Sequence, residues 1–386
     1  MNTFDTTISR KNTNSVKWDI PEKKYHQNDL LPFWIADMDF HVLPAVQNAF
    51  QEYIKQGVLG YTYFPQELFE SVIQWQATQH HYHLQKEEIL FHSGVVPSIA
   101  LAIQAFTQPN DAILIHDPVY PPFASVVKAN HRKLVRNQLI EKEQFQIDFD
   151  RFEELIIEEK VKLFILCNPH NPGGRVWQPD ELYHMGRICQ KHQVLVVSDE
   201  IHQDLVFAPN LFTTYHNVDA SFSDHSLVLT SATKTFNLAG IKHSMVFIKN
   251  PDLRQKFSML QKQLYQNEIN TFGMIGTQAA YQHGTRWLTD LLVYIEENIQ
   301  FTLTFLKQHL PQVTCMQPQA TYLLWLDFSS YGLTNSQLNK KMIEAAGVVL
   351  NAGITFGSMG DQHMRLNVAC PRKNLEEGLK RIAKVF

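Results

Sequence analysis

Short apolar segments, each bounded by turn-forming residues, recur through the middle of this 386-residue chain. Near-continuous apolar runs of this kind are typical of strands that are buried on both faces of a sheet. They lie at residues 88–92, 111–116, 162–167, 194–199, 226–231 and 243–249. Because helical patterns such as those of residues 95–106 and 179–192 separate several of the runs, we expect an α/β fold with a mostly parallel sheet and flanking helices.

The remaining segments predict smaller parts around this sheet. The runs at 226–231 and 243–249 are too close together for a helical crossover, which favours one antiparallel pair. A long helical region with a kink is expected over residues 251–309, and a smaller α+β unit is expected to follow it. The expected domains are an N-terminal arm with little regular structure that contributes to the small domain (1–45), a large domain (46–285) and a small C-terminal domain (286–386).

The composition argues against several classes of protein. Apolar residues make up 44% of the chain and charged residues 19%, which is the balance of an ordinary globular protein. The net charge of −4 and the lack of a long basic run give no sign of a nucleic-acid surface. The N-terminus lacks the apolar stretch of a secretory signal, and no apolar run approaches the length of a membrane span. The four cysteines are widely spaced and are interpreted as buried apolar residues. We therefore expect a soluble, cytoplasmic protein without a metal site.

Polar residues and glycines follow the expected strands. In open α/β sheets, ligands bind outside the carboxyl ends of the strands, so these positions are the first candidates for a functional site. They carry the sequences HSG (92–94), HDP (116–118), CNPHNPGG (167–174), SDEIH (198–202) and TSATK (230–234).

Lys234 is the most informative of these residues, and three interpretations of it are open. It is an exposed loop cation, or an amine that condenses with a carbonyl cofactor. The third interpretation is that Ser231 and Lys234 form the S-x-x-K pattern of serine acyl-enzymes, although the companion patterns S-D-N and K-T-G are absent.

Three further residues suit a flat aromatic cofactor. Asp199 ends an apolar run, and a carboxylate there can pair with a pyridine nitrogen; alternatively, it caps a helix or forms a turn. Asn171 lies in a restricted Pro/Gly turn and either bonds a cofactor oxygen or satisfies its own turn. Tyr120 is placed to stack on a ring or to pack against a loop. Glu200 is expected to point the other way and to be structural.

A phosphate group has a candidate site at residues 93–97. Ser93 and Gly94 introduce a predicted helix with Pro97 in its first turn, and the free N–H groups of a helix start bind phosphate. The patterns G-x-G-x-x-G and G-x-x-x-x-G-K-[ST] are absent, which argues against a dinucleotide or a nucleoside triphosphate. Lys242 is a candidate cation for a small monophosphate.

Taken together, these residues resemble a known family. The chain is similar to the fold-type I pyridoxal-phosphate enzymes, and more narrowly to the branch that contains bacterial cystathionine β-lyases, or C–S lyases. The resemblance extends over nearly the whole chain and implies a large domain with a seven-stranded type of sheet. The matching blocks are LPFWIADMDF (31–40), GYTYFP (60–65), DPVYPPF (117–123), NPHNPGGR (168–175), SDEIHQDLVF (198–207), SATKTFNLAG (231–240) and MRLNVACPR (364–372).

The resemblance implies a role for individual residues toward pyridoxal 5′-phosphate. Lys234 would bond the cofactor aldehyde and later take the substrate Cα proton. Asp199 would pair with the ring nitrogen, Tyr120 would stack on the ring and take part in catalysis, and Asn171 would bond the ring's 3-oxygen. The phosphate would be held by Gly94, Val95, Val96, Ser231 and Lys242.

The resemblance also implies how a substrate is bound. Arg365 would clamp the α-carboxylate in bidentate fashion, with Asn171 and Tyr61 as further contacts. Tyr61 would reach the phosphate of a neighbouring subunit and take part in catalysis there, which implies a homodimer with shared sites. His202, counted among the cofactor-binding residues, stands where many aminotransferases of this fold have tyrosine, and agrees with the lyase branch.

The expected reaction is α,β-elimination from an L-amino acid with sulfur on Cβ, such as cystathionine, cystine or cysteine. The products would be pyruvate, ammonia and a thiol, either homocysteine or hydrogen sulfide. Two alternatives stay open at this point. One is an aminotransferase of the same fold, and the other is a protein that keeps the fold and acts by binding a regulatory partner.

Overall fold

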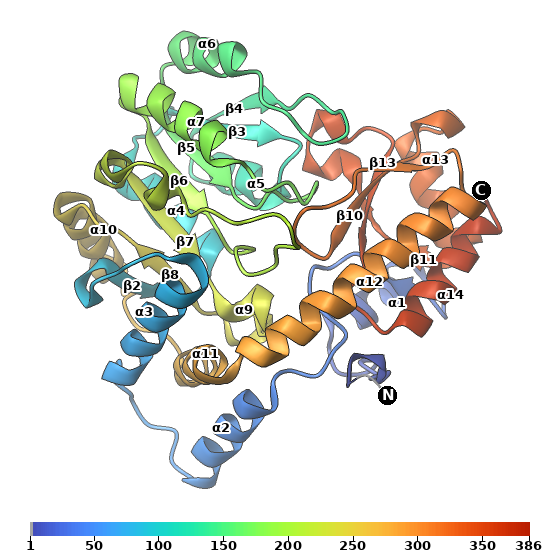
Figure 1. Cartoon of the computed structure of the whole chain (residues 1–386), viewed down its shortest axis with the longest axis horizontal. Coiled ribbons are helices and arrows are strands. Elements are labelled where there is room, and N and C mark those ends of the chain that lie inside the picture. The colour runs from blue at the N-terminus through green and yellow to red at the C-terminus, as the bar shows by residue number, and fades with distance from the viewer. Residues whose placement is uncertain (1–2) are drawn as a thin grey trace.

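The structure is a computed structural model that describes residues 3–386. Seven strands form one large sheet at the centre of the protein (Figure 1). The strand order is β2-β8-β7-β6-β5-β3-β4. The bounds are β2 Ile89–His92, β3 Ala112–Asp117, β4 Lys133–Gln138, β5 Val161–Cys167, β6 Leu195–Asp199, β7 Ser226–Thr230 and β8 Ser244–Phe247. The strands from β7 to β4 pair in parallel, whereas β8 is antiparallel to both β7 and β2. The predicted α/β fold and the predicted antiparallel pair are confirmed.

Both faces of this sheet are covered, as the apolar runs predicted. Along β5, Leu163 and Ile165 belong to one buried cluster, and Phe164 and Leu166 belong to the other. The first cluster includes residues of α4 (Val95–Phe106), α5 (Pro121–Ala129) and α10 (Pro251–Gln263). The second includes residues of α3 (Gln66–His80), α6 (Phe149–Glu159), α7 (Pro179–Lys191), α8 (Tyr215–Val218) and α11 (Thr271–His283).

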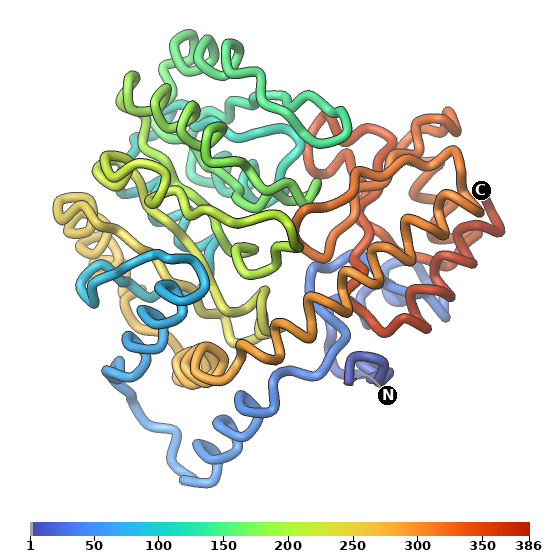
Figure 2. The backbone as a smooth tube through the Cα atoms, viewed as in Figure 1, coloured from blue at the N-terminus to red at the C-terminus, as the bar shows by residue number. Residues whose placement is uncertain are grey.

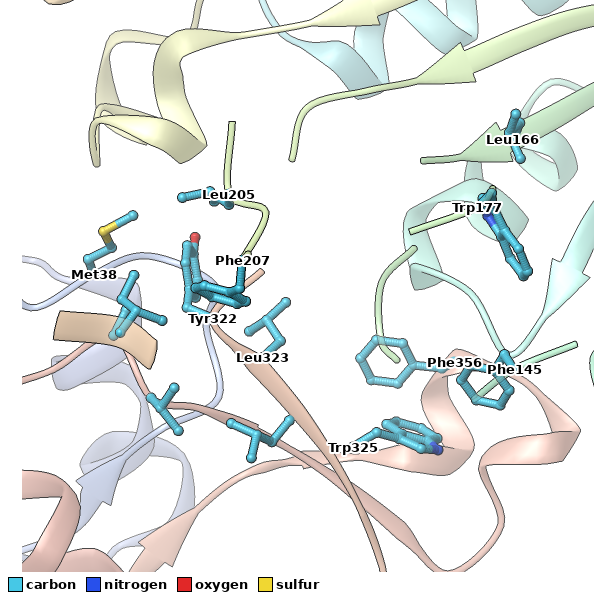
Figure 3. Close-up of a cluster of buried hydrophobic side chains, with 14 of the residues drawn as sticks. Met38, Phe145, Leu166, Trp177, Leu205, Phe207, Tyr322, Leu323, Trp325 and Phe356 are labelled. Atoms are coloured by element: carbon cyan, nitrogen blue, oxygen red, sulfur yellow. The ribbon is translucent and has the colours of Figure 1, made fainter. Parts of the chain in front are cut away.

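A smaller unit lies beside the large sheet and is reached through the long helix α12, Thr285–His309 (Figure 1). Its four-stranded sheet is antiparallel, in the order β12-β13-β10-β9. After α12, the elements of this unit are β9 Thr314–Cys315, β10 Leu323–Asp327, α13 Asn335–Lys340 with a π-helical turn at Lys341–Ala345, β11 Val348–Val349, β12 Asn351–Ala352, β13 His363–Asn367 and α14 Arg372–Ala383. The core is continuous between the two units: Leu205 and Phe207 lie beside Tyr322 and Leu323 (Figure 3).

The N-terminal segment is more ordered than we expected. Ser15 accepts a hydrogen bond from the Trp18 N–H and caps α1, Val16–Tyr25. Strand β1 (Leu31–Pro32) then pairs in parallel with β11, so the blue start of the chain lies beside its red end (Figure 2). The prediction of an arm with little regular structure was therefore wrong, because the helix is short and has almost no amphipathic pattern to reveal it. The pairing supports the assignment of the arm to the smaller unit, and the domain boundaries stay a prediction.

The predicted helical region at 251–309 is also different. It consists of three helices, α10, α11 and α12, rather than one kinked helix. Asn270 caps the start of α11 by accepting a hydrogen bond from the Gly273 N–H, so a new helix begins there after α10 has ended. Gly284 separates α11 from α12, where a Cβ atom would lie 2.3 Å from the Ala280 carbonyl oxygen and from the Phe236 ring.

Two further features bear on the expectations from the sequence. No helix within residues 3–386 is long and apolar enough to cross a lipid bilayer. All four cysteines are free, and three of them are buried.

The helix α2 (Pro44–Lys55) is followed by an extended segment, residues 56–65, which lies at the lower edge of the protein away from both sheets (Figure 1).

The buried side chain of Asn298 joins α12 to the segment that links β13 and α14, and it provides a test of the fold. Its Nδ2 donates to the carbonyls of Val368 and Cys370, and its Oδ1 accepts from Arg372 Nε. Asn298→Ala leaves buried carbonyls unpaired, so we expect the free energy of unfolding to fall by about 2–3 kcal/mol. Urea unfolding followed by circular dichroism measures this change. Glu297→Ala, on the exposed side of the same helix, is the control, and an equal loss in both variants would contradict the assignment.

Candidate active site

One edge of the large sheet collects most of the residues singled out in the sequence. All strands except β8 run in the same direction, so their carboxyl ends meet at this edge, and β8 begins there. The segments that lie at this edge are 93–97 after β2, 118–120 after β3, 168–174 after β5, 200–202 after β6, 231–235 after β7 and 242–243 before β8.

Lys234 lies in α9 (Ala232–Thr235), a single turn that follows β7. Its side chain is partly buried, and Nζ donates a hydrogen bond of 2.5 Å to the Ala36 carbonyl. Burial, together with the charge of Arg365, lowers the pKa of Lys234 to about 8, although Asp37 and Asp199 oppose this change. The interpretation as an exposed loop cation was therefore wrong. An amine with this pKa is partly neutral near pH 8 and can act as a nucleophile or a base.

The serine acyl-enzyme interpretation has no support in the geometry. Ser231 Oγ donates to the His243 carbonyl at 2.5 Å and accepts from the Thr233 N–H. Lys234 Nζ points to Ala36 instead of Ser231. The lysine is thus not placed to take a proton from the serine.

Asp199 is a buried carboxyl group at the end of β6. It accepts a hydrogen bond from the Ile201 N–H, and no ion pair with a side chain of residues 3–386 neutralises it. Burial raises its pKa to about 7, and the Ile201 bond and the charge of Lys234 only partly oppose this change. A protonated ring nitrogen placed against Asp199 would supply the missing positive partner.

Two neighbours of Asp199 have distinct surroundings. Glu200 accepts hydrogen bonds from Ser198 Oγ and from the Tyr215 N–H, so it links the end of β6 to the start of α8. This is the structural role that the sequence predicted. His202 is buried, and its Nδ1 has no hydrogen-bond partner within the described chain. Burial, helped by the charges of Lys234 and Arg365, lowers the pKa of His202 to about 3, so its imidazole is neutral.

The candidate phosphate site is assembled from three segments. Gly94 caps α4 with a φ of 151°, a conformation that favours glycine, and the helix start leaves the N–H groups of Val95 and Val96 without intrahelical partners. Ser98 Oγ bonds the Gly94 carbonyl and lies 3.3 Å from Ser244 Oγ.

The bond from Ser231 Oγ to the His243 carbonyl ties the end of β7 to the start of β8, beside the same helix start. Lys242 precedes His243 and is exposed, with a left-handed backbone. The predicted phosphate-binding residues are thus on neighbouring segments, and their roles stay predictions.

Arg365 on β13 brings the smaller unit into the site. Its two terminal nitrogens donate to Asn171 Oδ1 at 3.0 Å, to the Trp34 carbonyl at 2.8 Å and to Asn351 Oδ1 at 2.6 Å. Its Nε has no partner, and no carboxylate within residues 3–386 forms an ion pair with it. Burial lowers the pKa of Arg365 to about 10. A buried guanidinium without an anion is a site for a ligand carboxylate.

Tyr120 and Asn171 lie between these charged groups. Burial raises the pKa of Tyr120, and the nearby charges of Arg365 and Asp199 act on it in opposite directions. Asn171 is buried, and because its Oδ1 accepts from Arg365, its Nδ2 is left to donate elsewhere. These two residues therefore lie near the charged groups, and their roles toward the cofactor stay predictions.

Tyr61 is the one predicted residue that this chain does not bring to the site. It lies in the segment 56–65 and is fully exposed, with a relative exposure of 104%. The expected role of Tyr61 thus depends on a second subunit.

The geometry also reveals contacts that the sequence did not. The Ala36 carbonyl accepts hydrogen bonds from Lys234 Nζ and, at 2.9 Å, from Tyr322 Oη. Backbone acceptors such as Ala36 and Trp34 carry no side-chain signal. Only their place in the LPFWIADMDF block singled them out.

The described residues fit the expected cofactor. Pyridoxal phosphate needs an amine for its aldehyde, an acidic partner for its ring nitrogen and donors for its phosphate. Lys234, the unpaired carboxyl of Asp199 and the helix start at Gly94 offer these groups at one sheet edge.

Comparisons with known proteins agree with the fold and with the expected cofactor. Residues 28–382 match the family described as Aminotransferase class I and II. The chain is 40% identical to the cystathionine beta-lyase PatB of Bacillus subtilis over 380 residues, which covers 98% of each protein. The structure of cystalysin from Treponema denticola, which contains pyridoxal 5′-phosphate, has a TM-score of 0.97 and 32% identity and covers 100% of this chain and 98% of that one. The pyridoxal-phosphate-bound C–S lyase of Staphylococcus hominis has a TM-score of 0.92 and 31% identity, with coverage of 99% and 97%.

These matches confirm the resemblance and the fold type that the sequence indicated. They extend over nearly the whole chain, and they include both the strand-end residues and the smaller unit that carries Arg365. The chain therefore belongs to the aminotransferase class I and II family.

Proposed function

We propose that this protein is a pyridoxal-phosphate-dependent carbon–sulfur lyase that cleaves L-cystathionine or L-cysteine-type substrates by α,β-elimination. The observation that carries the proposal is that an amine and a guanidinium are held by the same short stretch of backbone. Lys234 offers an amine of lowered pKa, and Arg365 offers a buried guanidinium without a counter-anion. The two are anchored to carbonyls only two residues apart, those of Ala36 and Trp34.

The cofactor and the enzyme class agree with the relatives. Pyridoxal 5′-phosphate is contained in the cystalysin structure and in that of the S. hominis C–S lyase, and PatB is named a cystathionine beta-lyase. The predictions of this cofactor and of a carbon–sulfur lyase are confirmed by these relatives. The substrate and the products belong to the proposal.

In the proposed elimination, Asp199, Arg365 and Lys234 have separate roles. When bound, the cofactor withdraws electrons from the substrate α-carbon through its protonated ring. Asp199 keeps the ring nitrogen protonated, and Arg365 binds the α-carboxylate through bidentate hydrogen bonds.

Lys234 removes the proton from Cα, the Cβ–S bond breaks, and the sulfur leaves as a thiol after it gains a proton. Addition of water to the released aminoacrylate gives pyruvate and ammonia. One substrate and one water thus yield one thiol, one pyruvate and one ammonia.

We predict that the cofactor is attached to Lys234. The purified protein should be yellow, and borohydride reduction should fix the cofactor to the peptide that contains Lys234, as peptide mass mapping can measure. Lys234→Ala should lose this adduct. A stable adduct on another lysine in the unchanged protein would rule out the assignment.

The reaction type gives a further prediction. With cystathionine and no keto acid, the enzyme should release pyruvate and a thiol over many turnovers, because elimination regenerates the starting enzyme. Lys234→Ala should lower kcat/KM by about 10³-fold or more, since the base is lost. An aminotransferase would instead stop after a single turnover, with the cofactor in its aminated form.

We also propose that the protein acts as a homodimer with shared sites. The segment 56–65 exposes a group of large apolar and aromatic residues, namely Val58, Leu59, Tyr61 and Tyr63. Exposed apolar groups of this kind mark surfaces that bind another protein. In the resembling family, the tyrosine at the position of Tyr61 reaches the neighbouring subunit. A second copy of this chain would cover the segment and place Tyr61 in the partner's site.

Subunit mixing tests this arrangement. Tyr61→Ala and Lys234→Ala should each be weakly active or inactive alone. After the two variants are unfolded and refolded together, random pairing should restore about a quarter of the normal sites, because half of the dimers contain one intact site of two. Activity that stays at the level of the separate variants would contradict sharing of sites between subunits.

A further inference from the structure

The segment 34–40, which we call the strap, crosses the candidate site and holds both of its cations. Its Trp34 carbonyl accepts from Arg365 at 2.8 Å, and its Ala36 carbonyl accepts from Lys234 at 2.5 Å. Farther along, the Met38 N–H donates to Asn237 Oδ1, and Asn237 Nδ2 donates back to the carbonyls of Met38 and Phe40. The strap thus fixes the distance between the amine and the guanidinium.

Two cations of the N-terminal segment hold the strap from its other side. Arg10 forms two hydrogen bonds with the carboxylate of Asp37, at 2.7 and 2.9 Å, and a third with Asp39 at 2.8 Å. Lys17 donates to Asp39 Oδ2 at 2.8 Å and to the Asp37 carbonyl at 3.1 Å. The indole of Trp18 completes the cluster by donating to Asp39 Oδ1 at 2.9 Å.

The buried pair in this cluster, Lys17 and Asp39, argues for a positional role, whereas Arg10 and Asp37 are only partly buried. Lys17 has a relative exposure of 0% and Asp39 of 3%. Buried ion pairs add little stability compared with apolar residues of similar size, because desolvation offsets their attraction. What they do provide is a fixed geometry, since each charge must stay with its partners. Two cations and two anions here make a cluster with no net charge that fixes the two strap carboxylates.

The cluster also reaches Lys234 electrostatically. The charged groups that act on the Lys234 amine are Arg365 on β13, Asp199 on β6 and Asp37 on the strap. His202, which is neutral, and the hydroxyl of Tyr322 are the other titratable neighbours. Asp37 is therefore both a link in the strap and a source of negative charge beside the amine.

We propose that Arg10 and Lys17 are positioning residues, which hold the strap so that the Ala36 carbonyl orients the free amine of Lys234 toward the substrate while the Trp34 carbonyl orients Arg365. The inference rests on the proposed role of Lys234. It assigns a function to Arg10 and Lys17 of the N-terminal segment.

Substitution of Arg10 tests the mechanical part. In the holoenzyme, Arg10→Gln should speed hydrogen exchange in peptides that cover residues 33–40 by about tenfold and lower kcat by about tenfold, because the amine loses its fixed position. Arg10→Lys keeps the charge but loses the bidentate hydrogen bonds of the guanidinium. Its exchange rate and its kcat should therefore lie between those of the unchanged protein and those of Arg10→Gln. Lys11→Gln is the matched control, since Lys11 pairs with Glu22 on the same segment, away from the strap, and should change neither quantity.

Substitution of Asp37 tests the electrostatic part. The negative charge of Asp37 raises the pKa of Lys234, and a base works only when it is deprotonated. Asp37→Asn should therefore move the acidic limb of the kcat–pH profile to lower pH, by about one unit. A merely structural loss would reduce the rate at every pH and leave this limb in place.

The outcomes separate the inference from the proposed function. Faster exchange in Arg10→Gln with a shifted limb in Asp37→Asn supports the strap. Unchanged exchange and an unchanged limb overturn it, even in an active lyase. If Arg10→Gln does not fold, Arg10→Lys and Asp37→Asn decide in the same way. If the unchanged protein does not eliminate thiols, the proposed function fails, and the exchange measurement alone then decides the strap.

Discussion

The active site depends on charged side chains that are taken out of water without being paired with each other. Within residues 3–386, Arg365 has only neutral oxygen acceptors, and Asp199 has only a backbone donor. Burial shifts the pKa of each toward its uncharged form, as it does for Lys234. Each shift is relieved by a ligand group of the opposite charge. The charge pattern therefore supports the proposed roles, in which an anion would lie beside Arg365 and a protonated nitrogen beside Asp199.

The direction of the strands decides where these charges meet. If β8 ran parallel to its neighbours, Lys242 and His243 would lie at the opposite edge of the sheet from Ser231. Because β8 is reversed, its start lies beside the end of β7, and the bond from Ser231 to the His243 carbonyl joins them. The short connection between β7 and β8 thus serves the candidate phosphate site.

The sequence predicted the parts of the protein that local patterns determine. The central strands have long apolar runs, and the strand-end residues Asp199, Asn171 and Lys234 follow directly from the sheet. The edge strand β4 was missed because its sequence, KLVRNQ, buries only alternate residues. The helix α1 was missed because its contacts are with distant charges such as Asp39 rather than with an apolar face. The roles of Ala36 and Trp34 were beyond sequence analysis, since a backbone carbonyl looks alike at every position.

Three separate parts of the chain fix Arg365: the strap at Trp34, the large unit at Asn171 and the small sheet at Asn351. The guanidinium plane is thus set before a substrate arrives, which reduces the ordering cost of binding a carboxylate. Every α-amino acid carries that carboxylate, however, so this arrangement selects for amino acids in general and not for a sulfur group. Discrimination between substrates must come from the residues around Cβ and beyond. In a dimer of this kind, the segment of Tyr61 from the neighbouring subunit would form part of that wall. The choice of substrate would then be a property of two chains, whereas the proposed site for the α-carboxylate needs only one.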